Sequence, residues 1–120
     1  MPHLKKELFQ SYLDRAIEVR IMPIDAPATF AGTPEILVSF RKKAAIKIFT
    51  TQKLMDVSVR IDGHSYDAKD IGDNFYIVNE MPEIRRAKTY EVDVFACGNM
   101  VASALPLRVK KESGSEKSIL

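Results

Sequence analysis

The chain has 120 residues, of which 46% are hydrophobic and 28% are charged, the length and composition of one globular domain. Its 18 basic and 16 acidic residues leave a formal net charge of +2. This near balance argues against a dedicated nucleic-acid-binding protein, which usually carries a strongly basic face. The single cysteine, Cys97, excludes an internal disulfide bond and fits a reducing compartment.

No apolar run is long enough to span a membrane, and the first residues lack the apolar core of a signal peptide. We therefore expect a cytoplasmic protein, or one that is assembled in the cytoplasm into something larger, with no membrane partner.

The first segment, residues 3–15, has the apolar spacing of a short amphipathic helix, and Pro2 suits a first helical turn. Two interpretations of the apolar stripe stay open: it caps the domain's own core, or it docks into a partner. We treat residues 1–15 as a helical anchor ahead of the folded domain. The stripe consists of Leu4, Leu8, Phe9, Tyr12 and Leu13.

From Ala16 onward, apolar residues alternate with polar ones, which is the period of a β-strand with one buried face. The clearest case is the segment 89–96, in which Tyr90 and Val92 point away from Phe95. The predicted strands span residues 16–23, 35–40, 45–51, 54–61, 64–68, 74–79, 89–96 and 100–109.

Glycine and proline mark the connections between these strands. Asp62-Gly63 and Gly98-Asn99 favour tight turns, and three prolines in 23–34 predict an irregular loop. Pro106 cannot donate to a strand ladder, so the last strand should lie at a sheet edge or carry a bulge. Residues 111–120 have the composition of a flexible tail.

Alternation also assigns side chains to faces of the sheet. The segment 35–40 places Phe40 on the same face as Ile36 and Val38. The segment 74–79 is apolar on both faces, which indicates cover on both sides or a surface for a partner. Side chains predicted to face outward are Lys47, Phe49, Tyr76 and Phe95. Side chains predicted to face inward include Ile46, Ile48, Val101, Ser103, Leu105, Leu107 and Val109.

The strand pattern resembles an immunoglobulin-like domain of bacterial or viral type. The segments that carry the resemblance are 56–66, 73–77 and 88–94. It implies an all-β fold, an antiparallel β-sandwich over residues 16–110, with Tyr90 as the tyrosine whose hydroxyl bonds back to the backbone at a strand corner. The chain departs from antibody domains because it lacks the cysteine pair and the core tryptophan, and Val92 occupies the position of the second cysteine.

A helix ahead of one disulfide-free sandwich also resembles the layout of small bacteriophage capsid decoration proteins. This likeness implies a role in virion assembly and assigns no role to any residue. The sandwich fold itself hosts adhesion, assembly and carbohydrate binding alike, so it does not select a function.

The sequence contains no pattern that predicts catalysis. His64 has Asp62, Asp67 and Asp70 nearby, but these residues straddle a turn and should splay into solvent instead of converging on a metal ion. Cys97 has no histidine placed to activate it. We therefore expect no enzyme, no metal and no cofactor.

The leading interpretation is a non-enzymatic structural or interaction module that binds a larger protein assembly, such as a capsid or another self-associating complex. Its predicted contact residues are Leu4, Leu8, Phe9, Tyr12, Phe49, Tyr76 and Phe95. The alternative is a small β-barrel that binds single-stranded nucleic acid with Phe49 as a stacking surface. Its predicted contact residues are Arg41, Lys42, Lys43, Lys47 and Lys53.

Overall fold

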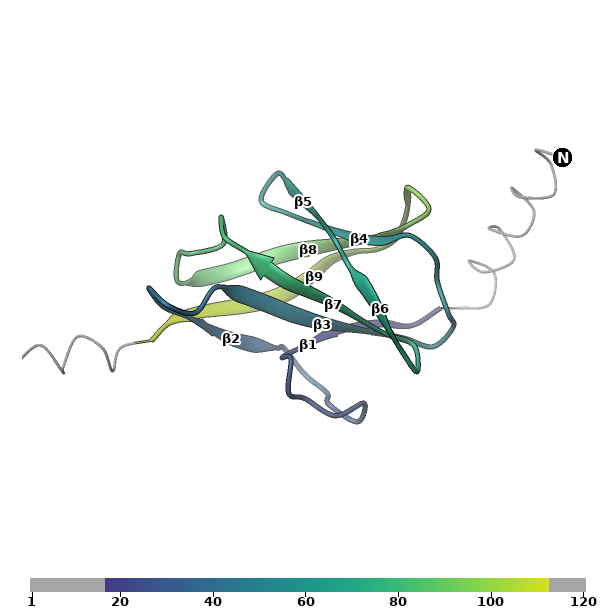
Figure 1. Cartoon of the computed structure of the whole chain (residues 1–120), viewed down its shortest axis with the longest axis horizontal. Helices are drawn as coiled ribbons and strands as arrows, with labels where there is room; N and C mark the ends of the chain where they lie inside the picture. Colours follow the sequence, from purple (N-terminus) through teal and green to yellow (C-terminus); the bar gives the residue numbers. More distant parts are fainter. Residues whose placement is uncertain (1–16, 113–120) are drawn as a thin grey trace, which may run out of the picture.

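In the computed structural model, residues 17–112 are described, and they form two β-sheets that pack face to face, with no helix in that range (Figure 1). This confirms the predicted all-β class. The strands are β1 (Val19–Met22), β2 (Glu35–Val38), β3 (Ala44–Thr50), β4 (Val57–Ile61), β5 (His64–Asp67), β6 (Lys69–Gly72), β7 (Phe75–Met81), β8 (Lys88–Ala96) and β9 (Asn99–Lys111). The predicted helix over residues 3–15 lies outside the described residues.

The two sheets are built from strands that are mixed along the chain. One sheet has four strands in the order β1-β3-β7-β6, and the other has five in the order β2-β9-β8-β4-β5. All neighbouring strands are antiparallel except β2 and β9, which run parallel. Because the described strands form two separate sheets, the alternative prediction of a single closed barrel is wrong.

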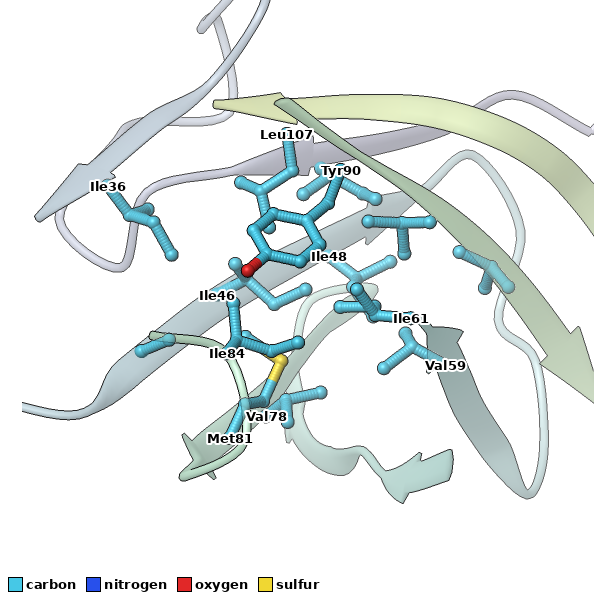
Figure 2. Close-up of a cluster of buried hydrophobic side chains, with 14 of the residues drawn as sticks. Ile36, Ile46, Ile48, Val59, Ile61, Val78, Met81, Ile84, Tyr90 and Leu107 are labelled. Atoms are coloured by element: carbon cyan, nitrogen blue, oxygen red, sulfur yellow. The ribbon is translucent and has the colours of Figure 1, made fainter. Parts of the chain in front are cut away.

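The core fills the space between the sheets with aliphatic side chains from alternate positions (Figure 2). Ile46 and Ile48 of β3 face Val59 and Ile61 of β4, and each is fully buried. Burying such a side chain stabilises the fold by about 1.5–3 kcal/mol relative to leaving it in water. Ile84, in the connection from β7 to β8, closes one end of this core.

Tyr90 lies near the start of β8, and its hydroxyl donates a hydrogen bond to the backbone oxygen of Arg86 at 3.3 Å (its ring is labelled in Figure 2). The predicted hydrogen bond back to the preceding backbone is therefore present. Val92, two residues further, is fully buried between the sheets. An apolar valine thus fills the space at which the resemblance would place a cysteine.

Phe40 departs from its predicted face because β2 ends at Val38. The Ser39 hydroxyl accepts hydrogen bonds from the backbone N–H groups of Arg41 (3.3 Å) and Lys42 (3.0 Å), and the Ser39 N–H donates to Lys42 O at 2.9 Å. A serine that satisfies its neighbours' backbone in this way ends the strand in a turn. Phe40 therefore lies at the tip of the turn and is 94% exposed.

The last strand is bulged, which is one of the two alternatives predicted from Pro106, although Pro106 itself pairs in register with Glu91. Val92 pairs with Leu105 but Val94 pairs with Ala102, so two residues of β9 lie opposite Asp93. In the bulge Ala104 has a φ of 54°, and its N–H donates to Asp93 Oδ1 at 3.0 Å. The prediction that Ser103 faces inward is wrong because the extra residue reverses the alternation, and Ser103 is exposed.

The other alternative predicted from Pro106, a position at the sheet edge, does not hold for β9. It lies between β2 and β8, but β2 pairs only with Arg108–Lys111. Pro106 precedes that pairing, so its missing N–H leaves no gap in the ladder to β2.

Candidate interaction surfaces

The outer face of the four-stranded sheet carries four side chains that form one group: Arg20, Lys47, Phe49 and Phe75. We call this group the aromatic face. Arg20 pairs with Phe49 across β1 and β3, and Phe49 pairs with Phe75 across β3 and β7. The two rings lie 5.1 Å apart between centroids at an angle of 53°, a favourable geometry for an aromatic pair.

Arg20 covers one side of this aromatic pair. Its guanidinium carbon lies 4.8 Å from the centroid of the Phe49 ring. The Nη1 atom donates to the backbone oxygen of Phe30 at 3.0 Å, and Nε lies 3.2 Å from Glu18 Oε1, close enough for an ion pair although not aligned as a hydrogen bond. The loop between β1 and β2 therefore holds the guanidinium in place over the ring.

Lys47 covers the other ring in a similar way. Its Nζ atom lies 4.9 Å from the centroid of the Phe75 ring and donates to the backbone oxygen of Ala26 in the same loop. Lys47 and Phe49 both point outward and Ile46 and Ile48 inward, as predicted. The aromatic face thus presents two half-buried rings between two cations that are fixed before any partner arrives.

Phe95 also points outward, but from the five-stranded sheet on the opposite side of the molecule. The guanidinium carbon of Arg60 lies 5.1 Å from the Phe95 ring centroid, and Arg60 Nη2 lies 3.4 Å from Asp93 Oδ2. One flat partner surface cannot contact Phe49 and Phe95 together. The predicted contact residues Phe49 and Phe95 therefore belong to two separate surfaces.

Tyr76 is not on either surface, so the prediction that it faces outward is wrong. It is 1% exposed, and its hydroxyl accepts a hydrogen bond from Leu54 N–H at 2.7 Å and donates to Leu54 O at 3.2 Å. Phe75 and Ile77 take the outer side of β7 instead. The other predicted contacts, Leu4, Leu8, Phe9 and Tyr12, lie outside the described residues.

The five predicted nucleic-acid contacts do not form one patch. Arg41, Lys42 and Lys43 occupy the turn between β2 and β3, whereas Lys47 is tied down on the aromatic face. Lys53 follows the opposite end of β3, with its Nζ atom 3.9 Å from Asp70 Oδ2.

The structure instead brings other cations beside Arg41, Lys42 and Lys43. Arg85 Nη2 donates to Ser39 O at 3.1 Å, which joins the β7–β8 connection to the β2–β3 turn. Arg86 follows Arg85, and Lys111 pairs with Val38 at the end of β2. Sequence analysis missed these residues because no strand register links positions 39 and 85.

The residues with the greatest chemical reactivity are dispersed. His64 is the first residue of β5 and follows the turn between β4 and β5. Cys97 lies in the turn between β8 and β9. Since Ile61 pairs with Val92 and Val57 with Ala96, the two turns lie at opposite ends of the sandwich. Within residues 17–112, no three His, Cys, Asp or Glu side chains lie together in a way that could hold a metal ion.

The surroundings of Tyr66 oppose the ionisation of its hydroxyl. Burial, and then the Glu83 carboxylate to which the hydroxyl donates a hydrogen bond, raise the pKa of Tyr66 above its ordinary value. Tyr66 also lines an open hollow of about 620 Å³ beside β5 and β7. A phenol that holds its proton so firmly is a hydrogen-bond donor and not a base.

These features define a two-sheet, all-β sandwich domain with charged and aromatic side chains on its outer surfaces. Residues 29–112 match the family described as "Domain of unknown function (DUF7862)", and the chain belongs to this family. The match begins in the loop before β2 and ends directly after β9. Neither a curated protein nor a solved structure matches the chain. Between residues 17 and 112, no helix has the length and apolarity to cross a bilayer.

Proposed function

We propose that this protein is an immunoglobulin-like module that works without catalysis by attaching to a larger protein assembly, with a virus capsid as the concrete case. The strand order supports the fold assignment. In an immunoglobulin domain one sheet has the order A-B-E-D and the other contains G-F-C. The sheets β1-β3-β7-β6 and β9-β8-β4 follow these orders, and the Tyr90 hydrogen bond lies at the expected strand corner.

The aromatic face carries the functional part of the proposal. Aromatic and arginine side chains dominate the binding energy of protein interfaces. Phe49 and Phe75 pack together on the outside of a sheet, and Arg20 and Lys47 are already held over them. A partner that docks here loses little entropy to ordering these side chains, so more of the contact energy appears as affinity.

The test is recovery of the partner from the native source with a tagged chain. The variant Phe75→Ser removes one ring of the aromatic face, and Phe95→Ser is the matched control because it removes a ring that is also half-buried from the opposite sheet. We expect Phe75→Ser to weaken the affinity for the assembly about tenfold, which corresponds to about 1.4 kcal/mol, and so to lower the recovered molar ratio when the chain is present near its dissociation constant. The control should recover it at the wild-type ratio.

A wild-type chain that remains monomeric and recovers no partner in stoichiometric amount contradicts the proposal, and so does equal loss with both variants. For the capsid case, the tagged chain is mixed with virus particles from the same source and sedimented. Absence of the chain from the particle fraction rejects that case.

A further inference from the structure

One end of the sandwich gathers cations from three separate stretches of chain. These are the β2–β3 turn (residues 39–43), the β7–β8 connection (residues 82–87) and the end of β9 (residues 110–112), which lie together at the left of Figure 1. The hydrogen bond from Arg85 to Ser39 joins the first two, and the pairing of Val38 with Lys111 joins the third. We call these three stretches the basic end.

Cations far outnumber carboxylates in these stretches. The cations are Arg41, Lys42, Lys43, Arg85, Arg86, Lys110 and Lys111, and the carboxylates are Glu83 and Glu112. Two of these cations form ion pairs: Lys43 Nζ lies 3.7 Å from Glu80 Oε2, and Lys110 Nζ lies 3.3 Å from Glu35 Oε1. The Glu83 carboxylate accepts a hydrogen bond from the Tyr66 hydroxyl. Arg41, Lys42, Arg85, Arg86 and Lys111 form no ion pair with any residue in 17–112. Because the whole chain has a net charge of only +2, its positive excess is concentrated here.

Phe40 lies in the β2–β3 turn, directly before Arg41 and Lys42. It is the most exposed large hydrophobic residue in the described range, at 94%, while Arg41 and Lys42 follow it in the same turn. The Ser39 hydrogen bonds fix the backbone on both sides of the turn. An exposed ring on a turn that also carries cations can serve as a surface on which a nucleic-acid base stacks.

A hollow of about 310 Å³ opens beside the turn. Lys42 and Lys43 contribute to its wall together with Leu37 of β2. Its volume is at the lower end of those that accept small ligands, and it is large enough for a single flat base. A flexible strand can place a base in such a hollow, whereas a flat lipid surface cannot follow it. The remaining lining residues are Pro23, Ile24, Asp25, Glu35, Ile36 and Ala45.

We propose that the basic end binds single-stranded nucleic acid. Arg41, Arg85 and Arg86 contact phosphates, since the guanidinium group presents a planar set of donors that matches phosphate oxygens. Lys42 adds a further cation at the rim of the hollow, and one base stacks on Phe40. This site does not include Lys47 or Lys53, and it does not depend on the protein interface proposed for the aromatic face.

The test is fluorescence anisotropy of a labelled oligothymidylate of about 12 nucleotides, titrated with the full chain at several salt concentrations. We expect binding at low salt whose logarithmic affinity falls with the logarithm of salt by roughly 0.7 per phosphate contacted. Phe40→Ala should weaken binding about tenfold and leave this slope unchanged. The double variant Arg85→Ala/Arg86→Ala should weaken binding and reduce the slope by about 1.4.

The control for charge is Lys53→Ala/Lys69→Ala, which removes the same charge outside the basic end, and the control for an exposed apolar side chain is Met55→Ala. Both should bind within about twofold of the wild-type chain. All substituted side chains are exposed, and unchanged thermal melting by circular dichroism verifies that each variant is folded.

Failure to bind the oligonucleotide at low salt overturns the proposal. Equal weakening by the charge control, or no effect of Phe40→Ala, also overturns it, because binding would then be general attraction of a polyanion. The same holds if polyglutamate competes as well as unlabelled oligonucleotide. Sedimentation of the chain with phosphatidylserine vesicles, without oligonucleotide binding, assigns the basic end to a membrane surface instead.

Discussion

The hydroxyl of Tyr76 holds the backbone of Leu54 from inside the core, accepting from its N–H at 2.7 Å and donating to its C=O at 3.2 Å. Leu54 lies in the connection that takes the chain from β3 of one sheet to β4 of the other. This single side chain therefore satisfies both polar groups of a buried residue where the chain changes layers.

Tyr76→Phe should destabilise the domain by about 1–3 kcal/mol, because it keeps the ring but leaves a buried N–H and C=O without partners. Urea unfolding followed by circular dichroism measures this as a lower midpoint with an unchanged m value. Wild-type stability in this variant would mean that the Leu54 backbone is satisfied by water.

Tyr90→Phe should cost less than Tyr76→Phe, about 0.5–1.5 kcal/mol. Its hydroxyl makes one hydrogen bond of 3.3 Å to Arg86, whose exposed position lets water replace the lost donor. The same urea experiment gives the comparison. The reverse order of the two variants would contradict the assigned burial of the two hydroxyl groups.

Ala104→Gly should stabilise the domain by about 0.5 kcal/mol. Ala104 has a φ of 54°, in the left-handed region that costs a residue with a Cβ atom about 1–2 kcal/mol. Glycine removes this cost. It also increases the conformational entropy of the unfolded chain, which offsets part of the stabilisation. The matched control, Ala102→Gly, replaces an alanine that pairs with Val94 and has no positive φ, so it should destabilise. Destabilisation by both variants would show that the bulge is not strained.

Tyr66 should titrate above the ordinary range of a tyrosine when absorbance near 295 nm is followed at alkaline pH. Burial and the Glu83 carboxylate raise its pKa in the folded state above the ordinary value of about 10. The folded state therefore keeps a proton that the unfolded state loses, so this contribution is fully present below about pH 10 and declines as pH rises further. Glu83→Gln should move the titration back toward the ordinary value, and an unmoved titration would exclude Glu83 as a cause.

The sequence predicted strands well wherever one face is apolar and the other polar. The segment 89–96 was predicted and β8 spans Lys88–Ala96, because its alternation is unbroken. The side of Tyr76 could not be predicted, since β7 is apolar on both faces and a period of two does not say which is inside. In the structure Tyr76 faces inward, where its hydroxyl forms hydrogen bonds with the backbone of Leu54.

The surfaces were less predictable than the strands. Phe49 was correctly placed outside, but its pairing with Phe75 depends on the register between β3 and β7. The cations Arg85 and Arg86 reach the β2–β3 turn through a connection, for which no periodic rule exists. The alternation of apolar and polar residues therefore cannot predict which side chains are brought together by loops.

The parallel pairing of β2 with β9 determines when β2 can fold during synthesis of the chain. Val38 finds its partner only at Lys111, so β2 has no ladder to join until almost the whole domain has left the ribosome. Pairing across so long a stretch of chain also slows folding, since loop closure must precede the contacts that stabilise it. The basic end, which this pairing helps to assemble, is consequently among the last parts of the nascent protein to acquire its final shape.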